Sequence, residues 1–434
     1  MSSVAVIGAG HVGLVTAASL ASWGHDVACL DIDEARIDGL RDGSVPILER
    51  DLPELLEVQR AAGRLCFGTV DARLVGPAEF VFLCLPTPSL DDGRPDVSAL
   101  DRCARRIGPM LAPGAVVVTK STVPVGSTLL VEAALGRSDV AVVSNPEFLR
   151  EAVALSDSLA PHRIVVGGDD KRAVARVAGL FRNVDSPVVL TDPASAETIK
   201  YASNAYLAMK ISFANSLGVL CGRLGANLSD VLLGVGYDPR IGSASLVPGP
   251  GWGGSCLPKD TAALRITARE HGFAFSLLDA AIEVNDEQRD RVVDAVRAHA
   301  GGDLSGARVG LWGLTFKAGT EDLRYSPALA VASALADAGA ILTAYDPAVT
   351  ATGARSLGGA DGPWGLLERC SDPYTAVTGA AVLVVLTEWD EFRWLDFKKV
   401  ADCMDGRSVV DTRQLLEPAA LRRAGLARIG VEDL

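Results

Sequence analysis

The feature that most constrains the fold is a repeated alternation between short, apolar, β-branched runs and longer stretches with helical spacing. In the first half of the chain the apolar runs are SVAVIG, DVACLD, EFVFLCL, AVVVTK, VAVVS and RIVVGG. Such alternation is typical of βαβ units, in which helices cover both faces of a parallel sheet. It predicts an α/β fold, with a doubly wound domain over residues 1–190.

The middle of the chain has helical spacing instead. Residues 195–225, SAETIKYASNAYLAMKISFANSLGVLCGRLG, predict one long helix that links two domains and supplies a dimer surface. Helical spacing resumes after a glycine-rich loop and continues to about residue 299, and a second α/β pattern begins at ARVGLWGL. We therefore expect three parts: residues 1–190, a helical domain over 191–300 that carries the glycine loop, and a second doubly wound domain over 301–434.

Charge and composition restrict the possible partners. The net charge is −13 and no basic tail or cluster occurs, which argues against nucleic acid or an anionic membrane as a partner. The N-terminus lacks the basic region of a signal peptide, and no uninterrupted apolar run approaches the roughly 20 residues that cross a bilayer. The eight cysteines form no CxxC pair. These features predict a cytoplasmic protein with mostly buried thiols and no bound metal.

A dinucleotide-binding motif opens the chain. In VAVIGAGHVGLVTAA, Gly8, Gly10 and Gly13 follow a predicted strand and begin a predicted helix. Glycines in this order permit a tight turn, close approach of a pyrophosphate and close helix packing. The next strand ends in Asp31, whose carboxylate would accept ribose hydroxyls and repel a 2′-phosphate. The first domain is therefore expected to be a Rossmann domain that binds NAD rather than NADP.

Several polar residues have the spacing of a site. Lys200 and Asn204 share one face of the predicted long helix, where an ammonium and an amide could stabilise an alkoxide. Glu147 and Glu151 follow the strand VAVVS, at the sheet edge where α/β proteins bind ligands, although an acidic pair at a helix start explains them equally well. Thr122, after the strand AVVVTK, could position a water.

The glycine loop GPGWGGSCLPKD presents one cysteine. Pro258 is a plausible first helical residue, so Cys256 is expected just before a helix N-terminus, with Lys259 nearby. Both influences favour the thiolate over the thiol. Farther on, FKAGTEDLRYSP carries Lys317 and Arg324, which are either phosphate contacts or a surface charge pair.

These segments together resemble the UDP-glucose/GDP-mannose dehydrogenase family. The resemblance rests on GAGHVGLVTAASLASWGHDVACLDID, CLPTPS, KSTVPVG, NPEFLRE, the ExxKYxxNAY of the long helix, DPRIG, GPGWGGSCLPKD, FKAGTEDLRYSP and TEWDEF, and it runs nearly from end to end. It implies two Rossmann-like domains joined by the helical part, and a four-electron oxidation of a nucleotide hexose at C6. Two NAD are used for each alcohol converted to an acid, through a thiohemiacetal and a thioester on Cys256.

The resemblance also implies roles for individual residues. The catalytic set is Cys256, Lys200, Asn204, Asp260, Thr122 and Glu147. The NAD contacts are Gly8, Gly10, His11, Val12, Gly13, Asp31, Arg36, Thr87, Thr122, Glu151, Lys259 and Arg324. The sugar-nucleotide contacts are Glu147, Phe148, Leu149, Lys200, Asn204, Arg240, Ser245, Leu246, Gly249, Gly251, Phe316 and Lys317. Arg240 is expected to reach the neighbouring active site of a homodimer.

Some positions depart from the family pattern. Arg50 and Asp51 stand where Pro-Gly is usual, Ala152 replaces a frequent glycine, Ala318 and Gly319 replace a Pro-Asn type pair, and Tyr325 replaces a frequent glutamate. None of these changes removes an implied catalytic group.

Three readings of the function stay open. The motif DPRIG favours UDP-glucose over GDP-mannose, but the base of dTDP-glucose differs from that of UDP-glucose by only one methyl, which is worth about 1 to 3 kcal/mol of discrimination. A two-electron β-hydroxyacid dehydrogenase would share the Rossmann domain and the Lys-xxx-Asn helix, yet it would leave Cys256 without a role. A catalytically silent NAD-binding scaffold would leave all the catalytic positions unexplained.

Overall fold

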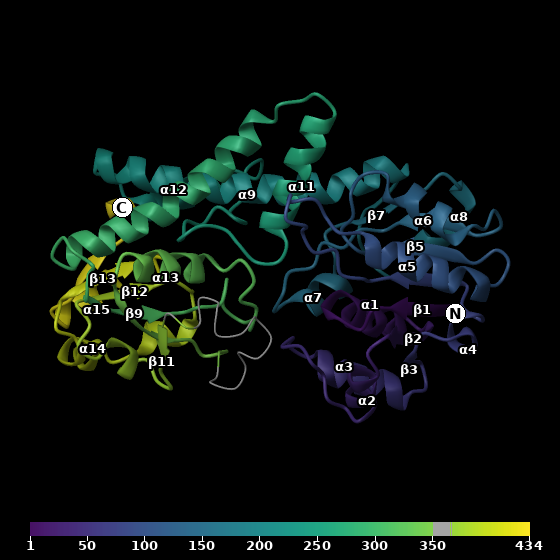
Figure 1. Cartoon of the computed structure of the whole chain (residues 1–434), viewed down its shortest axis with the longest axis horizontal. Helices are drawn as coiled ribbons and strands as arrows, with labels where there is room; N and C mark the ends of the chain where they lie inside the picture. The colour runs from purple at the N-terminus through teal and green to yellow at the C-terminus, as the bar shows by residue number, and fades with distance from the viewer. Residues whose placement is uncertain (350–364, 366) are drawn as a thin grey trace. The chain divides into compact units, whose positions relative to one another are not determined.

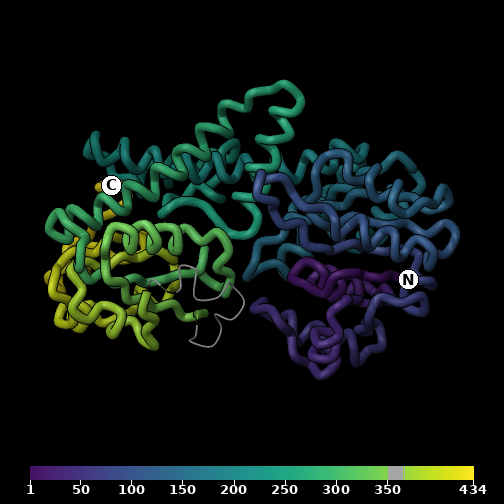
Figure 2. The backbone as a smooth tube through the Cα atoms, viewed as in Figure 1, coloured from purple at the N-terminus to yellow at the C-terminus, as the bar shows by residue number. Residues whose placement is uncertain are grey.

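A computed structural model describes residues 1–349, 365 and 367–434. The chain divides into two compact units, Met1–Ser203 and Asn204–Leu434. The first unit runs from purple to blue and the second from teal to yellow in Figures 1 and 2. Each unit is described by itself.

The first unit is built on an eight-stranded sheet of order β3-β2-β1-β4-β5-β6-β7-β8. Its strands are β1 (Ser3–Ile7), β2 (Asp26–Asp31), β3 (Leu65–Thr69), β4 (Phe80–Leu83), β5 (Val116–Thr119), β6 (Ala141–Ser144), β7 (Ile164–Gly167) and β8 (Val188–Thr191). The chain adds strands outward from β1 to β3 and then returns to place β4 beside β1. The carboxyl ends of β1 and β4 therefore flank the point where such sheets bind ligands.

Alternate residues of the strands enter two different cores, because successive side chains of a strand point to opposite faces. Val4 and Val6 pack on one face, whereas Ala5 and Ile7 pack on the other. The first face is covered by α1 (His11–Ser22), α2 (Glu34–Arg41), α3 (Leu52–Ala61), α7 (Ala154–Leu159) and α8 (Lys171–Gly179). The second is covered by α4 (Ala72–Val75), α5 (Ser98–Ile107) and α6 (Ser127–Leu135).

The first sheet, predicted to be parallel, contains one antiparallel pair. β7 pairs with β6 in the antiparallel direction, at Ser144 and Gly167, while all the other pairs in this sheet are parallel. Short apolar runs look the same whichever way a strand runs, so the sequence pattern carries no signal for this reversal.

The long helix α9 spans Pro193–Leu224, 32 residues, close to the predicted range. Its start is fixed by Glu197, a buried carboxylate that accepts hydrogen bonds from the N–H groups of Gly126 and Thr128 at 2.7 and 2.9 Å. Among the described residues, α9 is the one helix long and apolar enough to cross a membrane by length and composition. That finding is weak, because core helices of soluble proteins pass the same test.

The second unit begins with helices and ends with a six-stranded sheet. The helices α10 (Leu228–Gly236), α11 (Leu257–Glu270) and α12 (Ser276–His299) precede a parallel sheet of order β11-β10-β9-β12-β13-β14. Its strands are β9 (Arg308–Trp312), β10 (Ile341–Tyr345), β11 (Leu367–Arg369), β12 (Val382–Val385), β13 (Ser408–Asp411) and β14 (Ala427–Ile429).

Helices cover both faces of the second sheet as well. α12 and α13 (Pro327–Asp337) pack on one face through residues such as Val292, Val296 and Val331. α14 (Phe397–Cys403) and α15 (Pro418–Arg423) pack on the other. The predicted fold class, two doubly wound α/β sheets with a long central helix, is therefore confirmed.

Candidate active site

The dinucleotide motif has the geometry that the glycines predicted. Gly8 has φ +105°, and a Cβ there would lie 2.3 Å from the carbonyl oxygen of Cys84. A Cβ on Gly13 would lie 1.7 Å from the oxygen of Gly8, so a side chain at either position is excluded. Over Gly10, by contrast, no atom lies within 4 Å of a Cβ position. The backbone is therefore tightly packed at Gly8 and Gly13, while the space beside Gly10 is free. A pyrophosphate needs such space to approach the backbone.

Asp31 ends β2 as a firmly held carboxylate. Its Oδ2 accepts from Ala9 N at 2.8 Å and from Arg36 Nη1 at 3.1 Å, and its Oδ1 accepts from Asp33 N at 3.0 Å. Burial opposes ionisation, but the backbone donors and the guanidinium outweigh it and lower the pKa of Asp31. Asp31 is therefore ionised at neutral pH, as a carboxylate that accepts ribose hydroxyls must be.

His11, the first residue of α1, contacts a carboxylate that the sequence did not pair with it. His11 Nε2 lies 3.2 Å from Glu49 Oε2, and the other Glu49 oxygen accepts from Leu155 N at 3.3 Å. Val12, the next residue, packs against the first core. The loop before α3 is thereby tied to the start of α1 and to α7.

Thr87 and Thr122, both predicted to contact NAD, connect the segments that follow β4 and β5. Thr87 Oγ1 donates to the carbonyl oxygen of Thr122 at 2.8 Å. Beside them, Ser121 Oγ accepts from Leu85 N at 2.8 Å and lies 2.7 Å from the Leu85 oxygen. Both threonines thus lie at the carboxyl ends of neighbouring strands of the first sheet.

Glu147 and Lys200 form a buried ion pair in the first unit. Lys200 Nζ lies 2.8 Å from Glu147 Oε1, and their side chains are 4% and 7% exposed. Glu147 Oε2 accepts from Leu149 N at 2.6 Å. The Phe148 ring lies between two cations, with Arg163 Cζ 3.5 Å and Lys200 Nζ 5.6 Å from its centroid. Burial alone would raise the pKa of Glu147, but Lys200 and the Leu149 N–H reverse the shift and lower it.

A second lysine, which the sequence analysis did not single out, belongs to the same cluster. Lys120, directly after β5, donates from Nζ to Asn145 Oδ1 at 3.0 Å, and Asn145 Nδ2 donates to the Val165 oxygen at 2.7 Å. Burial lowers the pKa of Lys120 to about 8, although Glu147 nearby favours its charged form. Its position at the carboxyl end of a strand was the one available signal.

The second unit holds a matching cluster around Asp260. Asp260 is 0% exposed, and its two oxygens accept from Asn204 Nδ2 at 2.5 Å and from Lys259 Nζ at 2.6 Å. Such donors satisfy the hydrogen-bonding capacity of a buried carboxyl group. Asn204 thus contacts Asp260, a pairing that the sequence did not predict, and Lys259, predicted to contact NAD, makes an ion pair with the adjacent Asp260.

Cys256 occupies the N-cap position of α11. The helix begins at Leu257, so Pro258 is its second residue rather than its first. The thiol is half-buried, and its Sγ lies 3.7 Å from Ser255 Oγ. Elsewhere in the chain, burial raises the pKa of the Cys84 thiol to about 12.

The glycines before Cys256 lie against other backbone and ring atoms. A Cβ on Gly253 would lie 2.1 Å from the Tyr325 oxygen, and one on Gly254, at φ +81°, would lie 2.8 Å from the Phe316 ring. Phe316, predicted to contact substrate, therefore packs against the loop that carries the thiol.

The predicted cationic contacts of the second unit pair locally. Arg240 is exposed and binds Asp238, with Nη2 to Oδ2 at 2.6 Å; Arg324 binds Asp322 at 2.7 Å. Lys317 Nζ lies 5.6 Å from the centroid of the Phe316 ring.

The remaining predicted contacts differ in burial. Leu246 is 5% exposed, so it belongs to a small core rather than to an open surface, while the preceding Ser245 has φ +60°. Glu151 is half-buried. Gly249 and Gly251 are buried in the loop before Cys256.

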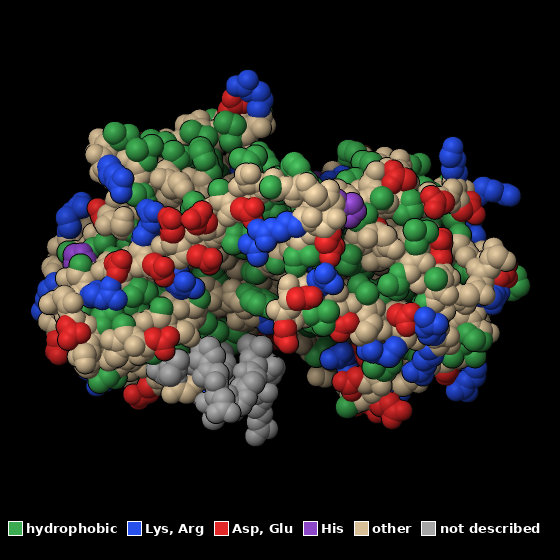
Figure 3. Space-filling view, turned by 45° about the horizontal axis from the view of Figure 1, so that its top comes forward, with side chains coloured by type: hydrophobic (Ala, Val, Ile, Leu, Met, Phe, Trp, Pro, Cys, Tyr) green, Lys and Arg blue, Asp and Glu red, His purple; other side chains and the backbone are tan. Residues whose placement is uncertain are grey.

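Acidic and basic side chains are interspersed over the face shown in Figure 3, without one large basic patch on that face. Within the described ranges, no three His, Cys, Asp or Glu side chains are grouped to hold a metal ion.

Comparisons with known proteins agree with this geometry. Residues 2–185 match the NAD binding domain of the UDP-glucose/GDP-mannose dehydrogenase family, residues 194–287 its central domain and residues 310–418 its UDP binding domain. UDP-glucose 6-dehydrogenase from Rhizobium meliloti is 43% identical, over 99% of this chain and 100% of its own length. UDP-glucose 6-dehydrogenase from Haloferax volcanii is 42% identical, over 98% of each.

A solved structure gives the same result for the fold. The UDP-glucose dehydrogenase of Pyrobaculum islandicum superposes with a TM-score of 0.90 at 34% identity, covering 100% of this chain and 98% of that one. The predicted family and the predicted cofactor, NAD, are both confirmed. This chain belongs to the UDP-glucose/GDP-mannose dehydrogenase family and is an NAD-dependent dehydrogenase.

Proposed function

We propose that the protein oxidises the C6 alcohol of UDP-glucose to the carboxylate, with two NAD reduced for each sugar. Relatives that match nearly end to end are UDP-glucose 6-dehydrogenases, and residues 310–418 match a UDP binding domain. The observation that carries the proposal is the half-buried thiol of Cys256 at the start of α11, the helix that also holds Asp260. An enzyme that stops at the aldehyde has no use for this thiol.

The first oxidation requires loss of a hydride from C6 and of the hydroxyl proton. Lys200 and Asn204 lie one turn apart on α9, so a hydroxyl that meets one of them can also meet the other. Their donors stabilise the developing alkoxide. Asp260 takes the proton through a water positioned by Thr122, and the product is an aldehyde. Gly8, Gly10, Gly13 and Asp31 would hold NAD, which when bound would supply the hydride acceptor for both oxidations.

The second oxidation requires a new tetrahedral centre, because an aldehyde carbon cannot become an acid by hydride loss alone. The Cys256 sulfur bonds to the aldehyde carbon and the carbonyl oxygen gains a proton, which gives a thiohemiacetal. Loss of a second hydride and of that proton leaves a thioester. Water, activated by Glu147, then adds to the carbon, the C–S bond breaks, and the acid and the thiol are released.

The remaining predicted residues act in binding. His11, Val12, Arg36, Thr87, Glu151, Lys259 and Arg324 contact NAD, and Phe148, Leu149, Arg240, Ser245, Leu246, Gly249, Gly251, Phe316 and Lys317 contact the sugar nucleotide. For Lys259 and Arg324 this requires that their carboxylate partners, Asp260 and Asp322, share them with NAD.

The protein acts as a homodimer in this proposal. Tyr206, Phe213 and Leu220 recur every two turns along α9 and are 57, 54 and 49% exposed. Such an apolar stripe on a helix matches a copy of itself. Arg240, exposed beside Asp238, then reaches the neighbouring active site.

Each of the three parts of the chain has its own role in this proposal. Residues 1–190 bind NAD, and residues 191–300 carry Cys256 and the dimer helix. Residues 301–434 bind the sugar nucleotide. The cytoplasm, where thiols stay reduced, is the proposed location, since oxidation of Cys256 would abolish its reaction.

A substrate panel tests the proposal. Steady-state rates and NADH formed per sugar are measured with UDP-glucose, dTDP-glucose, GDP-mannose and UDP-N-acetylglucosamine. We expect the highest kcat/KM with UDP-glucose, and two NADH per sugar. A preference for dTDP-glucose would change the substrate but keep the chemistry, one NADH per sugar would indicate a two-electron enzyme, and no NADH with any of the four would indicate a silent protein.

A further inference from the structure

Side-chain amides on two helices form hydrogen bonds with the loop that leads to Cys256. Gly249 N donates to Asn215 Oδ1, on α9, at 2.8 Å, and the Gly249 oxygen accepts from Gln288 Nε2, on α12, at 3.0 Å. Asn215 and Gln288 are each 1% exposed. Buried amides with backbone partners fix the position of the backbone that they bind, because breaking either bond leaves an unpaired polar group.

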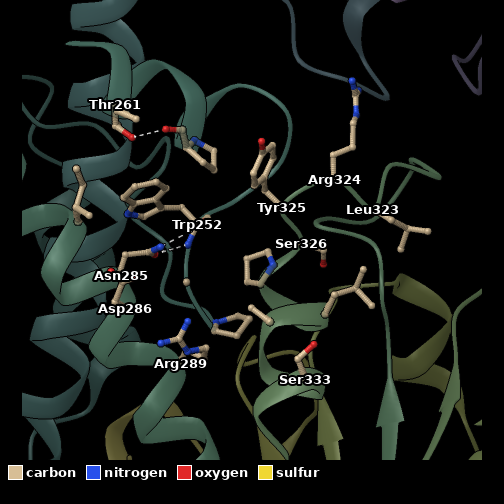
Figure 4. A pocket seen from close by; sticks show the side chains of 18 of the residues that line it. Trp252, Thr261, Asn285, Asp286, Arg289, Leu323, Arg324, Tyr325, Ser326 and Ser333 are labelled. Atoms are coloured by element: carbon tan, nitrogen blue, oxygen red, sulfur yellow. Dashed lines mark hydrogen bonds between the residues drawn. The ribbon is translucent and has the colours of Figure 1, made fainter. Parts of the chain in front are cut away.

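Trp252 is held in the same way by a single residue. Trp252 N donates to Asn285 Oδ1 at 2.7 Å, and Asn285 Nδ2 donates back to the Trp252 oxygen at 3.2 Å. Figure 4 draws both bonds between the loop and α12. One amide thus satisfies both backbone groups of Trp252, which only a side chain with a donor and an acceptor can do.

The indole of Trp252 provides a third anchor. Its Nε1 donates to Ser212 Oγ, on α9, at 2.9 Å, and Ser212 Oγ donates to the Ala281 oxygen, on α12, at 2.7 Å. The ring is buried, at 7% exposure for the residue. Both the backbone and the side chain of Trp252 are therefore fixed, four residues before Cys256.

The opposite side of the loop is open. A cavity of about 540 Å³ is lined by Trp252, Asn285, Arg289 and Tyr325, among others. Figure 4 shows these side chains arranged around it. Asn285 lines this cavity and holds the backbone of Trp252 there through two hydrogen bonds.

Only three residues, Gly253, Gly254 and Ser255, separate Trp252 from Cys256 along the chain, and Gly254 N donates to the Tyr325 oxygen at 3.3 Å. A shift at Trp252 is therefore transmitted to the thiol. We infer that Asn285 is a positioning residue for Cys256, needed to place the sulfur for capture of the aldehyde rather than for the first oxidation. This inference rests on the proposed role of Cys256.

The test is a single-turnover reaction with the full chain in excess over UDP-glucose, stopped at intervals so that sugar, aldehyde and acid are measured separately. In Asn285→Leu, which removes both bonds to Trp252, we expect sugar consumption within about 3-fold of wild type and acid formation slowed by about 10-fold or more, because small misplacements of reacting groups cost up to about 100-fold. Aldehyde should accumulate. Asn285→Asp keeps the acceptor for Trp252 N and should restore acid formation to within about 3-fold of wild type.

Two further variants keep the test decisive. Gln288→Met, which removes the donor to the Gly249 oxygen, should also slow acid formation more than sugar consumption. It replaces Asn285→Leu in the test if that variant does not fold. Asp396→Ala is the matched control. It removes a carboxylate oxygen that accepts hydrogen bonds from the N–H groups of Lys398 and Lys399, at 3.0 and 3.2 Å. We expect it to change neither the rate of sugar consumption nor the rate of acid formation.

The inference is wrong if Asn285→Leu and Gln288→Met form acid at the wild-type rate, or if they slow sugar consumption and acid formation equally. Failure of the proposed function looks different: wild type itself would form no acid, or Cys256→Ser would form acid at the normal rate.

Discussion

Glu147 and Lys200 meet as a buried ion pair, with Lys200 Nζ 2.8 Å from Glu147 Oε1. Glu147 follows β6, whereas Lys200 lies in the second turn of α9, so the pair joins the sheet edge to the long helix. In the proposed reaction the ammonium stabilises the substrate oxyanion and the carboxylate activates water, and Lys200 lowers the pKa of Glu147.

Glu147→Gln should break this pair and leave the Lys200 charge buried. We expect the free energy of unfolding at pH 7 to fall by about 3 kcal/mol, as for other broken buried pairs. The folded-state pKa of Glu147 lies below its ordinary value of 4.5, so the stabilisation is present above pH 4.5 and is lost as the pH falls through the folded-state pKa. Urea denaturation at pH 7 and pH 4 measures both effects. A difference between wild type and variant that grows on acidification would contradict this account.

Lys120 should make stability depend on pH in alkaline solution. Its pKa is lowered from 10.5 to about 8, so between these values the unfolded chain holds a proton that the folded chain has lost. Stability contributed by this group therefore rises with pH from about 8 to 10.5. In Lys120→Met that rise is absent, and we expect the variant to lose about 1 to 2 kcal/mol relative to wild type between pH 7.5 and pH 10. Denaturant titrations at the two pH values measure the difference; parallel pH profiles would show that Lys120 is not perturbed.

Two of the departures from the family pattern replace a glycine at a strained backbone position. Asp51 and Ala152 stand where glycine is frequent in the family, and they have φ +62° and +70°. For a residue with a Cβ, this left-handed conformation destabilises the folded state by roughly 1 to 2 kcal/mol relative to glycine. The greater conformational entropy of glycine in the unfolded chain offsets part of that difference.

Ala152→Gly should therefore raise the free energy of unfolding by about 0.5 to 1 kcal/mol, measured by thermal or denaturant unfolding. Gly179→Ala is the control, because Gly179 is helical with nothing within 4 Å of its Cβ position, and alanine there should stabilise instead. Destabilisation by Ala152→Gly would show that strain at this position is not relieved by glycine.

The exposed stripe on α9 predicts how the protein assembles. Phe213→Asp places a charge in the middle of the stripe and should convert the proposed dimer into a monomer in sedimentation experiments at micromolar protein. Trp394→Asp is the matched control, since Trp394 is 80% exposed outside the stripe and its change should leave the dimer intact. A Phe213→Asp protein that still sediments as a dimer would place the interface elsewhere.

Local sequence patterns predicted the features that depend on neighbouring residues. The βα alternation, the long helix and the glycine turn at Gly8 follow from spacing and from backbone freedom, and all are present in the structure. The direction of β7 was not predictable in this way. The direction of a strand depends on how the segments before and after it pack on the sheet. A four-residue apolar run has the same pattern in either direction.

The pairs that hold the site together were not predictable either. Lys120 meets Asn145, His11 meets Glu49, and Asn285 meets Trp252, each across a stretch of chain with no local signal. The folded sheet brings such residues together, so the sequence could suggest the catalytic residues by resemblance but not the side chains that hold them.

The most direct test of the account is the amount of NADH formed per UDP-glucose in a single turnover, compared between wild type and Cys256→Ser. With the thiol, we predict two NADH and one carboxylate for each sugar; without it, NADH formation should stop near one and no acid should be released at the wild-type rate. Two NADH per sugar and normal acid formation by Cys256→Ser would contradict the central claim, that the loop before α11 exists to present this sulfur to the substrate.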